Sequence, residues 1–184
     1  PSIASSLQQV GYETSYLYGG DINFTNMRSY LVATGFEHLT SMDDFTDATQ
    51  RSAKWGVHDE VTFEALAKDI MKTHHKPFLI GYSTLSSHEP WDVPTKLMDD
   101  KVLNAFNYLD GCIGKFVARL KQSKAWDNLL IVLIPDHGIS YGRYDNTQPE
   151  RNHIPMLWIG GAVKAPRTIN TLCNQSDMAA TLLG

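Results

Sequence analysis

A run of six apolar residues, Leu129–Ile134, is followed directly by Pro135, Asp136, His137 and Gly138. A run of this kind, rich in leucine and β-branched residues, is typical of a central parallel strand that is buried on both faces. Pro135 has no N–H to give to a sheet ladder, so we expect the strand to end there. The sequence therefore predicts a carboxylate and an imidazole at the carboxyl end of a buried strand, which is where open α/β sheets bind ligands.

Asp136 and His137 carry side chains that are good ligands for Zn, Mn or Fe. In a bare D-H pair, the usual interpretation is an aspartate that caps the next turn and a histidine at the surface. The position behind a buried strand, together with the family resemblance described below, favours metal binding instead. Catalytic metals of this kind usually keep about three protein ligands, so a further ligand is expected, and Asp21 and His153 are the candidates within the chain.

Helical and extended patterns alternate along the chain, which predicts an α/β fold with a mostly parallel sheet. Residues 35–54 show no clear period and are expected to form a surface excursion. Asp59 is expected to N-cap the helix that follows it. We predict helices over residues 3–10, 26–33, 60–73, 98–121 and 174–183, and strands over residues 14–18, 78–82, 129–134 and 154–159.

Two further loops follow predicted strands. The loop S-T-L-S-S-H-E-P at 83–90 places His88 in the same architectural position as the Asp136-His137 pair, where it could bind an anionic group or act as an acid, or could lie exposed in a serine-rich turn. Asp21, in G-G-D after the strand at 14–18, could be a ligand, a catalytic acid or a turn residue. His153 enters a strand, and it could lean toward the metal loop or serve structure alone.

The length of 184 residues suits one domain over residues 1–184. The formal charge is −4 and no basic stripe is present, which argues against a nucleic-acid partner. The longest apolar runs are too short to span a membrane. The two cysteines, Cys112 and Cys173, could form a disulfide or remain two buried thiols.

Several longer stretches follow one another along the chain in an order typical of one family. They are P-S-I-A-S-S-L-Q-Q-V-G-Y-E-T at 1–14, Y-G-G-D-I-N-F-T-N-M at 18–27, W-G-V-H-D-E at 55–60, L-S-S-H-E-P-W at 85–91, Y-L-D-G-C-I-G at 108–114, P-D-H-G at 135–138, N-H-I-P at 152–155 and Q-S-D-M-A-A-T-L-L at 175–183. Through them the chain resembles the sulfatase-like family of lipoteichoic acid synthases and phosphoglycerol transferases, in the alkaline phosphatase superfamily.

The resemblance implies an alkaline-phosphatase-like fold with three α/β/α layers, incomplete at its N-terminal side. It implies that Asp136 and His137 bind a divalent metal, Mn foremost, with Mg, Zn or Ca as alternatives. It implies that His88 is catalytic and contacts the phosphate of the substrate. The loop with Asp21 and Asn26 matches the substrate-facing loop, and His153 is a further substrate-binding candidate.

The substrate-facing loop departs from the lipoteichoic acid synthase pattern at three positions. Tyr18, Thr25 and Met27 stand where that pattern has His, Trp and Arg. Without the arginine, a bidentate phosphate contact is missing. Arg28 is one residue late for that role. Both phosphate and sulfate esters therefore stay open as substrates.

The function implied by the resemblance is that of a metal-dependent phosphoglycerol transferase, or a phosphate- or sulfate-ester hydrolase, that works through a covalent intermediate. Its nucleophile lies upstream of Pro1, so we expect the chain alone to be inactive. Its substrate is expected to be an ester, such as a glycerophospholipid, and its partner the upstream segment of the same catalytic domain. The parent protein is expected to be membrane-anchored on the extracytoplasmic face of a bacterial cell. Two alternatives are a self-contained metal hydrolase and a catalytically dead module that binds anions or polymers.

Overall fold

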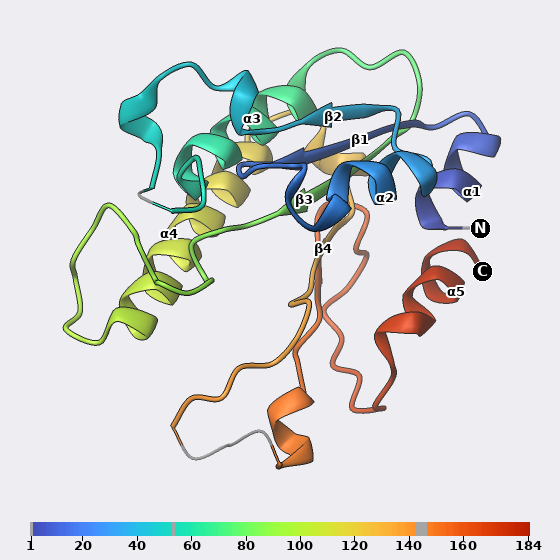
Figure 1. The fold of residues 1–184 in the computed structure, drawn as a ribbon. Helices are drawn as coiled ribbons and strands as arrows, with labels where there is room; N and C mark the ends of the chain where they lie inside the picture. Colours follow the sequence, from blue (N-terminus) through green and yellow to red (C-terminus); the bar gives the residue numbers. More distant parts are fainter. Residues whose placement is uncertain (1, 53, 143–146) are drawn as a thin grey trace. The chain divides into compact units, whose positions relative to one another are not determined.

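The computed structural model describes residues 2–52, 54–142 and 147–184. It divides into two compact units: a large unit of Pro1–Arg119 and Thr171–Gly184, and a small unit of Leu120–Asn170. The large unit contains a parallel sheet, and the small unit contains an antiparallel pair of strands (Figure 1). The stretches that resemble the family occur in both units. The prediction of one domain over residues 1–184 stays a prediction.

The sheet of the large unit consists of β1 (Glu13–Tyr18), β2 (His38–Thr40) and β3 (Phe78–Ser83) in the order β2-β1-β3. Both neighbours run parallel to β1, and Leu17 lies opposite Tyr82 in the register with β3. This arrangement confirms the predicted α/β class with a mostly parallel sheet. β2 was not predicted, because a strand of three residues at the sheet edge is too short to show an alternating pattern.

One face of this sheet is covered by α1 (Ile3–Gln9) and α2 (Met27–Ala33) (Figure 1). On that face the Tyr16 ring packs edge-on against Phe36, with ring centroids 5.1 Å apart. The ring crosses over Gly81, where an added Cβ would lie 2.3 Å from it, so the absence of a side chain there gives the aromatic ring its place. A cluster that includes Tyr18, Ile22 and Leu31 completes the core on this side.

The other face is covered by α3 (Asp59–Met71) and by the part of α4 (Lys101–Lys121) that belongs to the large unit. The Phe63 ring of α3 lies 4.9 Å from Tyr82 of β3 and 5.1 Å from Phe116 of α4. Helices therefore lie on both sides of the sheet, in the three layers that were predicted. The α5 helix (Met178–Leu183) returns to the large unit and contacts α1.

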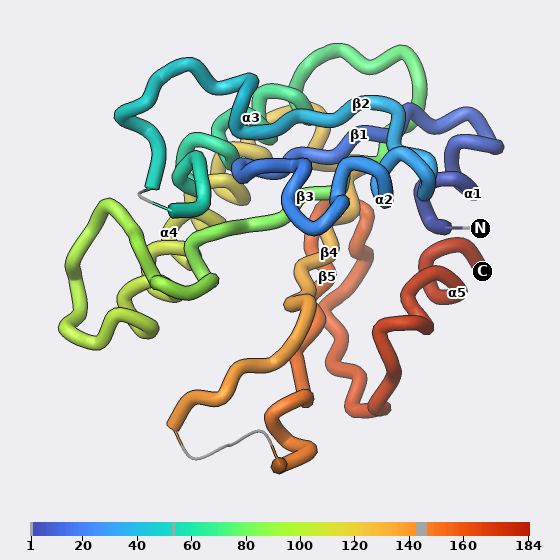
Figure 2. Tube along the Cα trace, in the orientation of Figure 1, coloured from blue at the N-terminus to red at the C-terminus, as the bar shows by residue number. Residues whose placement is uncertain are grey.

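The small unit pairs β4 (Ile131–Leu133) with β5 (Leu157–Ile159) in antiparallel fashion, as the tube in Figure 2 shows. The predicted strand over residues 129–134 is present as β4, shortened to Ile131–Leu133, but its pairing with β5 is antiparallel and not parallel as predicted. Leu130 and Ile134 are 41% and 36% exposed and lie outside the strand. An apolar run does not show whether its partner strand is parallel or antiparallel. Just before β4, the carbonyl of Leu129 accepts a hydrogen bond from the N–H of Ala162.

The remaining boundaries shift by a few residues. The third helix begins at Asp59 with His58 as its N-cap, so the expectation that Asp59 is the N-cap is wrong. The predicted strand at 154–159 is shortened to Leu157–Ile159, and the last predicted helix divides into a 3-10 turn followed by α5. The 3-10 turns are η1 (Phe24–Asn26), η2 (Met42–Asp44), η3 (Ala48–Gln50), η4 (Trp126–Asn128), η5 (Pro149–Asn152) and η6 (Gln175–Asp177).

Both cysteines carry free thiols, so they do not form a disulfide with each other. Cys112 is buried in α4, and burial raises the pKa of its thiol, whereas Cys173 is exposed. The expectation of two buried thiols is therefore correct for Cys112 alone. In the described part of the chain, no helix combines the length and the apolar character needed to cross a membrane.

Candidate functional site

His88 lies in the loop that follows β3, and its side chain is exposed. Its backbone N–H donates to the carbonyl of Leu85 at 3.1 Å. Its Nδ1 lies 2.8 Å from the carbonyl oxygen of Glu89. A carbonyl oxygen only accepts hydrogen bonds, so Nδ1 is the donor and Nε2 is the acceptor in the neutral ring. The loop thus fixes the tautomer of an imidazole that faces solvent.

Asp59 binds the beginning of the same loop from the first position of α3. Its carboxylate is 1% exposed. It accepts the N–H of Leu85 at 3.0 Å, the N–H of Ser86 at 2.9 Å and the hydroxyl of Tyr82 at 3.3 Å. A buried carboxylate needs such donors, because burying an unpaired charge is very costly. The side chain that the sequence assigned to a helix cap therefore holds two successive backbone N–H groups of the His88 loop.

Trp55 holds the other end of the loop. Its indole Nε1 donates to the carbonyl of Glu89 at 2.5 Å. Its ring packs edge-on against His88 at 4.7 Å and against Phe24 at 5.8 Å. Phe24 lies in the loop between Asp21 and Asn26, so Trp55 brings the predicted substrate-facing loop and the His88 loop together. No role for Trp55 was predicted, although W-G-V-H-D-E was among the family stretches.

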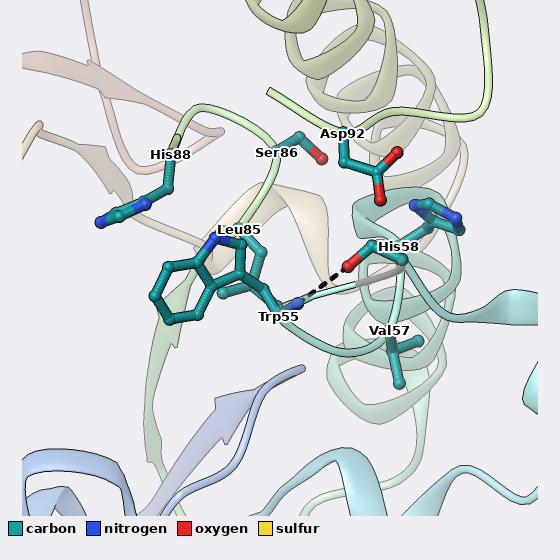
Figure 3. A pocket seen from close by; sticks show the side chains of 8 residues that line it. Trp55, Val57, His58, Leu85, Ser86, His88 and Asp92 are labelled. Carbon is teal, nitrogen blue, oxygen red and sulfur yellow. Dashed lines mark hydrogen bonds between the residues drawn. The ribbon is translucent and has the colours of Figure 1, made fainter. Parts of the chain in front are cut away.

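A shallow pocket opens beside His88, and Figure 3 shows the side chains around it. The pocket combines an indole, two imidazoles, a carboxylate and two hydroxyl groups with two aliphatic side chains. Its volume is about 10 Å³, roughly the room that one water molecule needs, so the pocket marks a polar surface depression beside His88 rather than a complete ligand cavity. The lining residues are Ser52, Trp55, Val57, His58, Leu85, Ser86, His88 and Asp92.

The substrate-facing loop is tightly turned. Asp21 is exposed, and its Oδ1 accepts the N–H of Asn23 at 2.9 Å, which is the turn role that the sequence left open for it. Thr25 and Asn26 both have left-handed backbones, with φ of 53° and 61°, and Asn26 N-caps α2 without a side-chain hydrogen bond. Tyr18 precedes this loop; burial raises the pKa of its hydroxyl, so that group stays neutral at physiological pH.

Gly56 holds the base of this loop, because it forms an isolated bridge with Gly20 and its neighbour Val57 donates to the carbonyl of Gly19. Its φ is +134°, and an added Cβ would lie 2.2 Å from the Gly19 carbonyl oxygen. We expect Gly56→Ala to lower the free energy of unfolding by about 3 kcal/mol, through backbone strain and overpacking together. Urea denaturation measures this loss.

The matched control for this prediction is Gly11→Ala. Gly11 also has a positive φ, of +91°, but an added Cβ there would meet no atom within 4 Å. We expect it to cost only the backbone term, about 1 kcal/mol. Equal losses in the two variants would mean that the contact between Gly56 and Gly19 does not constrain the loop.

In the small unit, Asp136 and His137 follow β4 as predicted, with side chains that are 89% and 67% exposed. The Oδ1 atom of Asp136 accepts the N–H of His137 at 3.0 Å. Nδ1 of His137 donates to the carbonyl of Gly138 at 2.8 Å, which leaves Nε2 as the ligating nitrogen. Nε2 lies 3.6 Å from Oδ2 of Asp136. Two donors on one tetrahedral ion are separated by about 3.4 Å, so the pair fits two positions of a single metal site.

Among the described residues, none completes this pair as a third ligand. No group of three or more His, Cys, Asp or Glu residues capable of holding a metal occurs among the residues that the structure describes. His153 lies in the small unit before β5, and its N–H donates to Glu150. The segment before His153 lies close to Asp136 and His137, since a Cβ added to Gly138 would lie 1.6 Å from the carbonyl oxygen of Arg151. Asp21 belongs to the large unit.

Known proteins resemble this chain over nearly its whole length. It is 28% identical to phosphoglycerol transferase I of Xanthomonas axonopodis pv. citri over 96% of the chain and 28% of that protein. It is also 28% identical to the lipoteichoic acid synthase-like protein YvgJ of Bacillus subtilis, over 97% of the chain and 33% of that protein. The chain thus spans about a third or less of these relatives.

A solved structure shares the fold. A Vibrio parahaemolyticus protein of the alkaline phosphatase superfamily superposes with a TM-score of 0.84 at 30% sequence identity, over 98% of this chain and 46% of that one. The model of the Sulfatase family matches residues 1–184. Together with the parallel sheet between two helical layers, these matches confirm the resemblance found in the sequence: the chain belongs to the Sulfatase family, within the alkaline phosphatase superfamily.

Proposed function

We propose that the chain is the portion of a phosphoglycerol transferase that binds the phosphate ester and contributes two ligands to its metal. The observation that carries this proposal is the similarity to phosphoglycerol transferase I over 96% of the chain. The geometry supports it, because His88 is exposed, has its tautomer set by Glu89 and lies beside a small polar pocket. The donor would be a glycerophospholipid, and the acceptor an alcohol.

In this proposal His88 contacts the phosphate. Protonated, its Nε2–H donates to a non-bridging oxygen or to the leaving oxygen, and histidine changes charge near neutral pH. The nucleophile is a hydroxyl from a part of the protein outside this chain. Its oxygen attacks phosphorus after its proton has passed to solvent, the bond to the leaving alkoxide breaks, and His88 gives the leaving oxygen its proton. The acceptor alcohol then attacks phosphorus and gives its proton to the neutral His88, and the bond between phosphorus and the enzyme oxygen breaks.

Asp136 and His137 would hold a divalent ion, for which Mn is the foremost choice. Their convergent Oδ2 and Nε2 atoms fit two positions of such a site, and further ligands would come from elsewhere in the protein. A bound divalent ion neutralises charge on ester oxygens and lowers the pKa of a hydroxyl nucleophile. By resemblance, the whole protein would be anchored in a bacterial membrane with this domain on the extracytoplasmic side.

Calorimetry on the full-length protein in saturating Mn tests the proposal. We expect sn-glycerol 1-phosphate to bind, and His88→Ala to weaken its binding about tenfold through the loss of a charged hydrogen bond. His75→Ala is the matched control, since His75 is exposed in the same unit and lies outside the site. If inorganic sulfate bound more tightly than glycerol phosphate, a sulfate-ester hydrolase would replace the transferase as the explanation.

A further inference from the structure

We infer that Asp59 and Trp55 act together as positioning residues for His88, holding its loop at both ends. The inference rests on the proposed role of His88 as the group that contacts phosphate. It assigns a function to Asp59 and Trp55, to which the proposed reaction gives no role of their own. Two side chains four residues apart in that stretch reach the two ends of one loop.

The first anchor is the carboxylate of Asp59. Its described partners come from the end of β3 and the residues that follow: the hydroxyl of Tyr82 and the N–H groups of Leu85 and Ser86. Two successive N–H groups can point at one carboxylate only when the backbone turns there, so the carboxylate fixes that turn. The position of Asp59 in the first turn of a helix of 13 residues further favours its negative charge.

The second anchor is the indole of Trp55. Its Nε1–H binds the carbonyl of Glu89, the same oxygen that accepts from Nδ1 of His88. The indole ring also lies against the imidazole at 4.7 Å. The indole therefore fixes both the acceptor that sets the tautomer and one side of the ring. Without it, the exposed His88 side chain would rotate freely among its staggered conformations.

In sequence, His88 lies between the residues that the two anchors bind. Leu85 and Ser86, which Asp59 holds, come just before it, and Glu89, which Trp55 holds, comes just after it. A hydrogen bond from the N–H of His88 to the carbonyl of Leu85 links the histidine to the first anchor. An exposed histidine would otherwise lose much of its catalytic value, because a displacement of about 1 Å costs about 100-fold in rate.

The test is a double-mutant cycle on transfer of glycerol phosphate by the full-length protein. We expect Asp59→Asn to lower kcat by about 100-fold, because the amide NH₂ faces a backbone N–H that the carboxylate accepted. In the His88→Ala background the same change is expected to alter kcat less than about twofold, since a positioning residue has nothing left to position. Asp69→Asn, on the same helix with a half-buried side chain paired to Lys72, is the matched control and is expected to leave both backgrounds unchanged.

Trp55→Phe provides a second, milder variant whose readout stands if Asp59→Asn does not fold. Phenylalanine keeps an aromatic ring beside His88 and removes the N–H to Glu89. We expect a loss of about tenfold in the wild-type background and none in the His88→Ala background.

The inference is overturned if either variant lowers kcat by the same factor with and without His88, because the residue would then serve only the fold. If His88→Ala itself leaves kcat unchanged, the proposed role of His88 fails first. In a different outcome, His88→Ala is impaired while Asp59→Asn and Trp55→Phe behave like the Asp69→Asn control. The proposed role of His88 then stands, and the positioning role of Asp59 and Trp55 is overturned.

Discussion

His137→Ala is expected to weaken Mn binding by the full-length protein by about 100-fold or more, since even the loss of an outer partner of a ligand costs 10–100-fold. The structure gives the reason. Nδ1 of His137 is engaged by the Gly138 carbonyl, and Nε2 is the nitrogen that converges on Oδ2 of Asp136 at 3.6 Å. Alanine removes one of the two donors that this chain would contribute to the site. Transfer activity should fall with the occupancy of the metal site.

Calorimetric titration with Mn measures this effect, with Asp136→Asn as the companion variant. The side chains of both residues are largely exposed, so neither change should unfold the protein. Asp127→Asn, in the η4 turn of the same unit, is the matched control and should bind Mn as the wild type does. An unchanged Mn affinity in His137→Ala would remove this pair from the metal site altogether.

His88→Ala is expected to lower kcat by about 10²–10⁴-fold, the usual worth of a positioned general acid or base. Its effect on stability should be small, because the side chain is exposed and its hydrogen bond to the carbonyl of Glu89 stays within the loop. His88→Gln should recover part of the glycerol phosphate affinity, since its amide can donate to phosphate, but little of kcat, because an amide carries no transferable proton.

Steady-state kinetics with saturating Mn, His75→Ala serving as the control, separates the two contributions of His88. Loss of kcat in both variants, with partial recovery of binding in His88→Gln, is the expected pattern. Equal recovery of kcat and binding in His88→Gln would mean that His88 only binds the phosphate and transfers no proton.

Much of the fold was predictable from patterns within short windows. β1 and β3 and the long helix α4 were found within three residues of their ends, because each buries a regular series of apolar side chains. β4 was mispredicted, since six apolar residues in a row are compatible with either direction of pairing and the partner β5 lies more than 20 residues away. The alternation of helices and strands favoured an α/β fold, and the family resemblance narrowed it to the alkaline-phosphatase-like arrangement.

In the candidate site, too, residues marked by a local pattern could be predicted, and residues defined by distant contacts could not. His88, Asp136 and His137 could be singled out because each follows a strand. The binding of the His88 loop by Asp59 and Trp55 could not be predicted, because it depends on hydrogen bonds to residues 26 and 34 positions away in the sequence. A local rule assigned Asp59 to a helix cap, and the structure places His58 there. A buried aspartate at a helix start that is not the cap indicates a partner elsewhere in the chain.

Phosphoglycerol transfer itself can be followed by ³¹P NMR of the full-length protein with phosphatidylglycerol and Mn. We expect the phosphodiester signal of the lipid to decline as glycerol phosphate leaves diacylglycerol, at the wild-type rate in His75→Ala and far more slowly in His88→Ala and His137→Ala. An intact lipid signal, together with rapid hydrolysis of an aryl sulfate by the same protein, would contradict the account.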